Sequence, residues 1–527
     1  MKIITKIIYL IKFLIHNKKY FNKSKFNNKN LILLENYNYL PSFIAYSYFA
    51  NILSKKYKAS IISYNPRVDT FSIKMKSIIN PKIWLNQILY RSFNVSGNII
   101  PKISKNQKIR SYKLSKKIYS QIKKKEDILR IKIFNIPVGD LIYDEFLRFY
   151  KEPTIDFKKI IFQKHLNNML DIFIFWIDFF KKNRVKSVVI SHSVYATAII
   201  SRIAIFKKIK VFNIGLSYAY SLDKKNILRL SGFEKYKKNF QIISKRLKKD
   251  LRKIAKKELN NKLYGKAASS FSLANSTSYS AFNNIKLQNK VGKKEKILVA
   301  AHCLTDAVHA YGNNQFVDFY SWMEFLGKIS TKTNFEWLIK IHPSQYDLNF
   351  NVIENFTKKF SKFTLLNKNI SHNEILNSYN ILGALTVYGS IGHEYPLFGV
   401  PVINASINNP HSSYSFNINT KSKKELENKI INIKKLKKPI NQKIKNEIYE
   451  FYYMRYQSEY YCLNNLSLIV KNLGSDFNSL ILFKWWLNNF NLNHHNKILN
   501  DYSSFIDSKK FRMHGDNTTK ESIFIDI

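Results

Sequence analysis

The chain has 527 residues, too many for one ordinary hydrophobic core, so at least two domains are expected. Hydrophobic residues make up 45% of the sequence and aromatic residues 15%, which excludes an intrinsically disordered chain. The formal net charge of +52 comes mostly from lysine, which is inflated together with Ile, Asn, Tyr and Phe, as in AT-rich coding sequences. No nucleic-acid-binding module accompanies this charge, so we expect anionic membrane surfaces, nucleotide sugars or acidic glycans as partners, and no nucleic acid.

The two cysteines, Cys303 and Cys462, lie far apart in the sequence and lack the spacing of a metal site. Their scarcity fits a reducing compartment and argues against a fold held by disulfides. We therefore predict a cytoplasmic protein.

Residues 1–25 mix Ile, Leu, Tyr and Phe with lysines, among them Lys2, Lys6, Lys12, Lys18 and Lys19. The apolar stretch is shorter than the ~20 residues of a membrane-spanning helix, and no signal-peptide cleavage site follows. An amphipathic helix lying on an anionic membrane and an ordinary buried first helix remain the two alternatives. The first would make the protein peripheral on the inner face of the cell membrane.

Residues 26–285 are predicted to form a Rossmann-like domain, because strand patterns alternate with helix patterns as in a parallel sheet. The predicted strands are 30–38, 58–66, 185–192 and 209–215, and the predicted helices are 42–57 and 193–208. Ser193 is expected to cap the second helix. The basic stretch 234–262 is interpreted as a helix with a solvated face, and 265–284 as a loop between domains.

Residues 286–475 show the same alternation and are predicted to form a second Rossmann-like domain. Its predicted strands are 295–304, 335–343, 363–367, 381–389 and 400–405, with a helix at 316–330 and helical residues at 422–472. Residues 476–527 are expected to form C-terminal helices and a tail that is loose from about Asp507. The predicted fold class is therefore α/β, with two Rossmann-like domains facing a cleft and ligands beyond the carboxyl ends of the strands.

The stretch VYGSIGHEYPLFGVPVIN, residues 387–404, holds three of the chain's 14 glycines beside a His-Glu pair. A strand, a tight turn and a helix starting near Ser390 are predicted. Glycines permit positive φ and close backbone approach, and free N–H groups at a helix start attract anions. Gly389, Ser390, Ile391 and Gly392 are therefore candidates for a phosphate cradle, with Glu394 placed to accept hydrogen bonds from ribose or a base. Ordinary tight turns of a parallel sheet are the alternative explanation.

In LIKIHPSQ, Lys340, His342 and Pro343 fall at the carboxyl end of a predicted strand. The imidazole could donate to a phosphate and the ammonium could neutralise one, while the proline closes the strand. A purely structural histidine is the alternative.

In AAHCLTDAVHAYG, the residues His302, Asp306 and His309 are spaced i, i+4 and i+7; if the segment is helical, they share one face and could bind a divalent metal. No supporting ligand cluster accompanies them, so we predict polar contacts to substrate and no metal. Six of the 12 histidines fall in the second domain, at positions 302, 309, 342, 372, 393 and 411, which favours an active cleft there.

Five side chains are candidates for a general base: Asp140, Asp144 and Glu145 in IPVGDLIYDEFLR, His192 in VVISHSVYAT, and Asp306. A capped, solvated helix start is the favoured alternative for the three acids, and a hydrogen bond in a β–α turn is the alternative for the histidine. Signatures of a hydrolase elbow, a Walker loop or a zinc site are not found in the sequence.

Several segments resemble bacterial capsule and O-antigen polysaccharide biosynthesis proteins, a group related to GT-B glycosyltransferases. They are KILVAAHCLTDAVHAYG, WLIKIHPSQ, ILGALTVYGSIGHEYPLFGVPVINAS and NNPHSSYSFN in the second half, and VGDLIYDEFLR and VVISHSVYAT in the first. The resemblance spans roughly residues 130–455 and implies a GT-B fold, with the donor nucleotide in the second domain and the acceptor in the first.

The His-Pro pair followed by a serine-containing glycine turn is also similar to bacterial sialyltransferases and β-Kdo transferases. By that similarity, His342, Pro343 and Ser390 would hold the phosphate and ribose of a CMP-sugar, and Glu394 matches the acid that follows the turn in many GT-B enzymes. The acidic-acidic-glycine motif of those transferases has no match, because YDEFLR lacks the glycine. The catalytic base and the choice among CMP, UDP and GDP donors therefore stay open.

We predict a metal-independent glycosyltransferase without a cofactor, which moves a sugar from a nucleotide-activated donor to a surface polysaccharide or lipid-linked glycan. The alternatives are a UDP-sugar 2-epimerase or a CDP-glycerol-type polymer transferase on the same fold, and a non-catalytic glycan-assembly protein.

Overall fold

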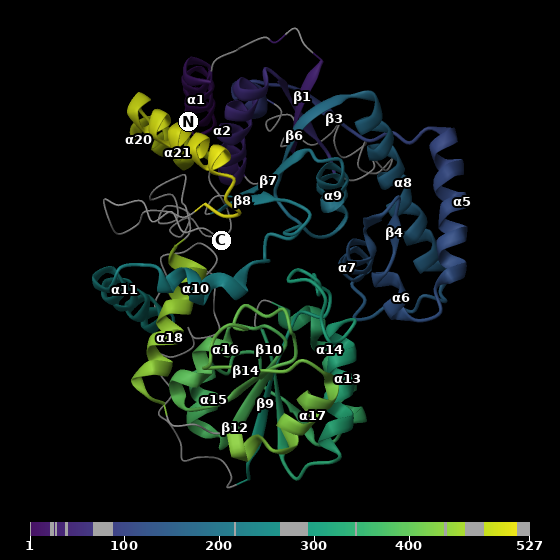
Figure 1. Cartoon of the computed structure of the whole chain (residues 1–527), viewed down its shortest axis with the longest axis vertical. Coiled ribbons are helices and arrows are strands. Elements are labelled where there is room, and N and C mark those ends of the chain that lie inside the picture. Colours follow the sequence, from purple (N-terminus) through teal and green to yellow (C-terminus); the bar gives the residue numbers. More distant parts are fainter. Residues whose placement is uncertain are drawn as a thin grey trace.

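A computed structural model of the chain describes residues 2–21, 26, 29–36, 40–66, 88–215, 218–263, 294–342, 345–436, 440–458 and 479–513. The predicted loop at 265–284, Pro343 and Cys462 lie outside the described residues. Within them the chain forms two lobes, each built around a six-stranded sheet (Figure 1).

The sheet of the first lobe has the order β3-β2-β1-β6-β7-β8. Its strands are β1 (Asn30–Glu35), β2 (Ser60–Tyr64), β3 (Val95–Ile99), β6 (Arg184–Ile190), β7 (Lys210–Ile214) and β8 (Ala219–Leu222). Neighbours pair in parallel except β7 and β8, which are antiparallel. The main helices of this lobe are α2 (Leu40–Tyr57), α5 (Lys105–Gln121), α7 (Gly139–Tyr150), α8 (Ile160–Lys182) and α9 (Ile199–Phe206).

The sheet of the second lobe is entirely parallel, in the order β11-β10-β9-β12-β13-β14. Its strands are β9 (Lys296–Ala301), β10 (Glu336–Ile341), β11 (Phe363–Leu365), β12 (Ile381–Thr386), β13 (Val402–Asn404) and β14 (Ile418–Asn419). Its helices include α13 (Phe319–Ser330), α14 (Tyr346–Lys359), α15 (His372–Ser378), α16 (Ile391–Glu394) and α17 (Lys423–Ile431). In chain order, both six-stranded sheets follow the Rossmann order 3-2-1-4-5-6. The predicted fold class is confirmed.

The two lobes share contacts along the carboxyl ends of their strands. Apolar residues of α7, α8 and β6 belong to the same buried cluster as residues of β9, β10 and α13. Asp318, which caps α13, accepts hydrogen bonds from Tyr143 and Thr154 of the first lobe, each at 2.5 Å. The carboxyl edges of the two sheets are therefore held toward each other.

The last helices return to the first lobe. Figure 1 shows α20 (Ser479–Asn489) and α21 (Leu492–Ser508) beside α1 (Lys2–Tyr20) and α2, and residues of these helices share one buried cluster. Beyond them, Met513 donates its backbone N–H to Ala219 in β8 at 2.9 Å. The prediction of a loose tail from about Asp507 is therefore wrong as far as Met513. None of the described helices is both long and apolar enough to cross a bilayer.

Two local predictions of the first domain need correction. Ser193 caps no helix: its hydroxyl accepts the backbone N–H of Arg229 at 3.0 Å, and α9 begins only after a 3-10 turn at Ala196–Ala198. The basic stretch 234–262 forms two helices, α10 (Tyr236–Gln241) and α11 (Lys245–Leu263). One face of α11 is buried against α18 (Gln442–Tyr452), so the stretch is only partly solvated.

Candidate functional site

A pocket of about 350 Å³ opens at the carboxyl edge of the second sheet, where β9, β10 and β12 end. The direction of the strand order reverses between β9 and β12, which is the position where open α/β sheets bind ligands. Seven residues predicted from sequence to contact a nucleotide line it: His302, Lys340, His342, Gly389, Ser390, Ile391 and Glu394. The structure therefore brings these seven residues together, and their contact with a ligand stays a prediction.

The turn between β12 and α16 is fixed by two side chains. Thr386 accepts the backbone N–H of Gly389 on its hydroxyl at 2.9 Å, and the same hydroxyl lies 3.0 Å from Nε2 of His302. That nitrogen also accepts the backbone N–H of Val387 at 3.1 Å. Burial lowers the pKa of His302 to about 4, so its ring is neutral near pH 7 and serves as an acceptor that orients the turn.

The helix that follows the turn is short. α16 is a single turn that continues as a 3-10 turn at Tyr395–Phe398 and ends at Gly399, as predicted. Among the described residues, the backbone N–H groups of Ser390 and Ile391 have no hydrogen-bond partner. Both residues line the pocket, so these donors and the Ser390 hydroxyl are available to a ligand.

The three glycines of this stretch serve different purposes. Only Gly399 has a positive φ, of 78°. A Cβ on Gly389 would lie 2.6 Å from the hydroxyl of Thr386, so this glycine permits the tight turn. Gly392 does not line the pocket, because it packs under His411 and Asn417. The interpretation of Gly392 as part of a phosphate cradle therefore needs correction.

We expect Gly392→Ala to lower the free energy of unfolding by roughly 1–3 kcal/mol, the usual cost of overpacking a buried site. The new methyl group would lie 2.6 Å from the His411 ring and 2.7 Å from Asn417, both buried or nearly so. Urea denaturation measures the loss. Gly97→Ala is the matched control, because a Cβ there meets no atom within 4 Å. Equal stability of the two variants would contradict the packing.

Lys340 brings a positive charge to the pocket. Its side chain is buried, its ammonium donates to the carbonyl of Lys368 at 3.3 Å, and it forms no ion pair with any described carboxylate. Burial lowers the pKa of Lys340 to about 8, against a smaller opposing effect of Glu374. A buried ammonium without a counter-ion attracts an anionic ligand.

Lys262, which was not among the residues predicted from sequence, is carried by α11 into the same pocket. Its ammonium lies 2.6 Å from Oε1 of Glu394, and both side chains are buried. Burial opposes ionisation of Glu394, but the adjacent Lys262 ammonium, together with His393 and His372, outweighs this effect and lowers the pKa of Glu394 to about 2. Among the described lining residues, Glu394 is the only acid, and Lys262 neutralises it. Lys340 therefore gives this lining one net positive charge.

Two further histidines, His342 and His372, line the pocket. His342 is exposed, and partial desolvation together with the charges of Lys340 and Lys262 lowers its pKa below the usual range. His372, counted only as one of six histidines in the sequence, contacts the hydroxyl of Tyr395 at 2.7 Å, and burial lowers its pKa to about 4. The described lining is therefore rich in hydrogen-bond donors and poor in negative charge.

None of the five candidate bases lines this pocket. Asp140 pairs with the buried Arg202 at 2.5 Å, and Glu145 accepts the backbone N–H of Ala196 at 3.0 Å. Asp144 bridges the lobes: one oxygen contacts Nδ1 of His309 at 2.7 Å and the other accepts the backbone N–H of that residue. Each of the three acids of α7 therefore has partners within the fold, which fits a structural role.

His192 and Asp306 lie at the junction of the lobes. Tyr195, which follows β6 with a strained φ of 61°, donates its hydroxyl to Asp306 and accepts the backbone N–H of Ala307 at 2.9 Å. Burial, with the charge of Arg229, lowers the pKa of His192 to about 4, so it is neutral near pH 7. A neutral imidazole can accept a proton, so His192 can act as a base. Asp306 is exposed to solvent.

Residues 302–309 are not helical, so the condition for a shared face is not met; they form a turn after β9. His302 contacts Thr386, Asp306 contacts Tyr195, and His309 contacts Asp144, so the three side chains point to different partners. No group of three or more His, Cys, Asp or Glu side chains in the described part of the chain is arranged to hold a metal ion.

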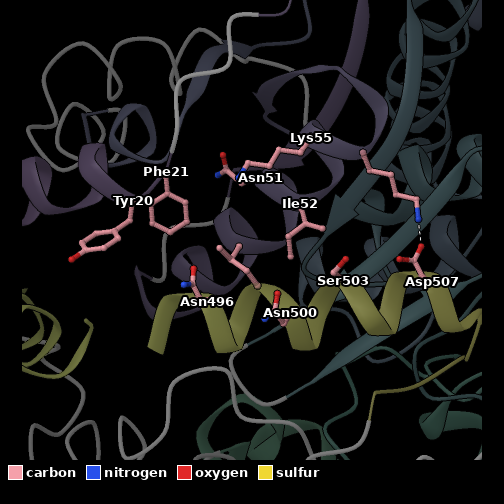
Figure 2. A pocket seen from close by; sticks show the side chains of 11 residues that line it. Tyr20, Phe21, Asn51, Ile52, Lys55, Asn496, Asn500, Ser503 and Asp507 are labelled. Atoms are coloured by element: carbon pink, nitrogen blue, oxygen red, sulfur yellow. Dashed lines mark hydrogen bonds and ion pairs between the residues drawn. The ribbon is translucent and has the colours of Figure 1, made fainter. Parts of the chain in front are cut away.

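A second pocket, of about 570 Å³, lies in the first lobe between the end of α1, α2 and α21 (Figure 2). Asn51, Asn496, Asn500 and Ser503 line it, and its Lys56 is paired with Asp507. It is larger than the pocket of the second lobe, but it lies away from the carboxyl ends of the strands, and none of its lining residues was a candidate site residue.

No protein-family model and no curated protein matches the chain. Among solved structures, the chain is similar to the Methanocaldococcus jannaschii UDP-GlcNAc 2-epimerase in complex with UDP-GlcNAc and UDP, with 14% identity, coverage of 79% of this chain and 97% of that chain, and a TM-score of 0.23. It is also similar to the UDP-GlcNAc 2-epimerase from Neisseria meningitidis bound to UDP-GlcNAc, with 10% identity, coverage of 80% and 97%, and a TM-score of 0.22. At such scores the assignment of two Rossmann-like domains rests on the strand order of this chain itself.

Proposed function

We propose that the chain is an enzyme that acts on a nucleotide-activated sugar, and that the pocket at the carboxyl edge of the second sheet binds the nucleotide through its phosphate. The observation that carries this proposal is the buried Lys340 ammonium, which lacks a carboxylate partner among the described residues and shares the pocket with the free N–H groups of Ser390 and Ile391. Cations and fixed N–H donors at a topological switch point are the usual means of holding a phosphate.

In this proposal, Lys340 neutralises the phosphate while His342 and Ser390 donate hydrogen bonds to it. These groups would stabilise the charge that develops on a departing nucleotide, because they are fixed before the reaction begins. Glu394, held by Lys262, would accept hydrogen bonds from ribose hydroxyls. His192 and Asp306, at the lobe junction, remain the candidates for the base.

Two reactions fit such a site, and they differ in what they require. Glycosyl transfer to a surface polysaccharide or lipid-linked acceptor was the main prediction from sequence, and a UDP-sugar 2-epimerase was an alternative. The two epimerase structures compared above belong to the class of that alternative. Incubation with one UDP-sugar and no acceptor separates the two: an epimerase converts it to the 2-epimer, whereas a transferase leaves the sugar unepimerised until an acceptor is supplied.

Nucleotide binding is tested by a thermal-shift screen with CMP, UDP, GDP and CDP. We expect one of them to raise the unfolding temperature, with a response that saturates with concentration. A chain that responds to none of the four, or to all equally and only at low salt, contradicts the proposal and favours a non-catalytic glycan-assembly protein.

We expect nucleotide affinity to weaken as the pH rises above about 8. The pKa of Lys340 is about 8 in the free protein, so above that pH the ammonium progressively loses the proton that binding requires. For one coupled proton, the limiting loss is about tenfold per pH unit. Calorimetric titration between about pH 7 and pH 9.5, with the nucleotide that gives the largest thermal shift, measures it. Lys340→Arg should flatten the profile, because a guanidinium stays charged; an identical profile in this variant would contradict the assignment.

A further inference from the structure

Helix α1 is fastened to the first lobe by one face only. Phe13 is buried against Phe483 of α20, with ring centroids 4.7 Å apart. Asn17 is also buried, donating to the hydroxyl of Ser92 and accepting from the indole of Trp486, each at 3.0 Å. The rotation of the helix about its axis is thereby fixed, so its opposite face keeps one orientation relative to the lobe.

That opposite face is apolar and exposed. Ile4, Ile7, Ile8, Ile11 and Ile15 are each between 47% and 64% exposed. Their spacing of three and four residues places them in one stripe along the helix. Leaving five isoleucines of one helix in water is unfavourable, and contiguous apolar surface of this kind marks a contact with a protein or a membrane.

The charges around the stripe select between these partners. Lys12, Lys18 and Lys19 are exposed on the same side of the helix and form no ion pair with any described carboxylate. α1 contains no acidic residue. A second copy of the chain packed through this face would bring lysines against lysines, whereas an anionic lipid surface offers negative charge to the lysines and an apolar layer to the isoleucines.

We propose that α1 docks the protein on an anionic membrane, with the isoleucine stripe inserted at the level of the acyl chains and Lys12, Lys18 and Lys19 at the phosphates. This goes beyond the proposed function and does not depend on it. One face of the helix is buried, as the second sequence interpretation of residues 1–25 expected, and the proposal assigns the exposed face to the first.

The test is sedimentation with vesicles of phosphatidylcholine containing one third phosphatidylglycerol, compared with vesicles of phosphatidylcholine alone. The chain carries a net charge of +52 and would bind anionic vesicles weakly through charge alone, so the isoleucines are decisive. We expect Ile7→Gln/Ile11→Gln to weaken binding to the anionic vesicles on the order of 100-fold, about tenfold for each half-inserted side chain. Lys12→Gln/Lys18→Gln/Lys19→Gln should weaken it by a similar factor.

The matched control is Ile160→Gln/Ile242→Gln, which changes two isoleucines of similar exposure, 62% and 65%, outside α1. It should bind as the unchanged chain does, and all variants should keep the thermal unfolding midpoint because every altered residue is exposed. Equal binding by the α1 isoleucine variant and the control would overturn the proposal. A second result would also overturn it: no binding to vesicles, and a dimer in analytical ultracentrifugation that dissociates in Ile7→Gln/Ile11→Gln. This result would assign the isoleucine stripe to a contact with a second copy of the chain.

Discussion

Lys262→Met is expected to lower the free energy of unfolding by about 3–5 kcal/mol at pH 7, because it leaves the Glu394 carboxylate buried without its counter-ion. The ammonium and the carboxylate lie 2.6 Å apart, and both side chains are almost completely buried. Exposed pairs behave differently, since solvent screens them. Lys359→Met, which removes an exposed lysine paired with Glu324, is therefore the matched control and should cost about 1 kcal/mol or less.

The free energy of unfolding lost in Lys262→Met should depend on the pH and on the presence of the Glu394 carboxylate. The pKa of Glu394 is depressed to about 2, so the ion pair stabilises the fold above the ordinary carboxyl pKa of 4.5 and loses its effect only as the pH falls toward 2. In Lys262→Met, burial without the ammonium raises that pKa, so the carboxyl takes up a proton and the deficit shrinks toward pH 4. The double variant Lys262→Met/Glu394→Gln should recover much of the stability at pH 7. Urea denaturation at both pH values measures these differences; a deficit equal to that of Lys359→Met is incompatible with a buried pair.

Lys340→Met is expected to weaken binding of the preferred nucleotide by roughly 2–3 kcal/mol, about 100-fold, because it removes the unpaired cation of the pocket. The change also relieves the cost of burying a charge, so the free energy of unfolding should stay the same or rise. Loss of affinity without loss of stability is the combination that distinguishes a ligand-binding lysine from a structural one. Isothermal titration calorimetry and urea denaturation on the same preparation give both quantities.

Lys332→Met is the control for that experiment. Lys332 belongs to the same lobe, but it precedes β10 while Lys340 lies near the end of that strand, and its partner is the carboxylate of Glu427 at 2.7 Å. It removes the same net charge from the lobe, so a general electrostatic effect on nucleotide binding would appear in both variants. Equal affinities of the two variants would show that the pocket does not use Lys340.

The sequence predicted nine of the 12 strands of the two sheets, all but β3, β8 and β14, because a parallel sheet covered on both faces needs nearly continuous apolar strands. NLILLE in β1 and KILVAA in β9 carry this pattern, and both are paired and largely buried as expected. It could not decide the conformation of residues 302–309, where a spacing compatible with a helix belongs to a turn whose side chains contact three separate partners. It also failed for the segment after Asp507, which pairs with β8 across nearly 300 residues of sequence, a contact that local pattern does not encode.

The pocket itself was predictable where its residues lie near or just after strand ends, as Lys340 and Ser390 do, because strand order brings those ends together. Lys262 was not predictable, since it stands in a basic helix among many lysines and only the packing of α11 brings it to Glu394. The acids of α7 looked catalytic in sequence, but Asp140 and Asp144 are engaged by Arg202 and His309, residues 62 and 165 positions away.

The most direct test of the proposed site is a crystal structure of the chain with the nucleotide that gives the largest thermal shift. The account predicts a phosphate oxygen within hydrogen-bond distance of the Lys340 ammonium and of the backbone N–H of Ser390. A nucleotide bound elsewhere, such as between α1, α2 and α21, with the pocket beyond β9, β10 and β12 empty, would contradict it.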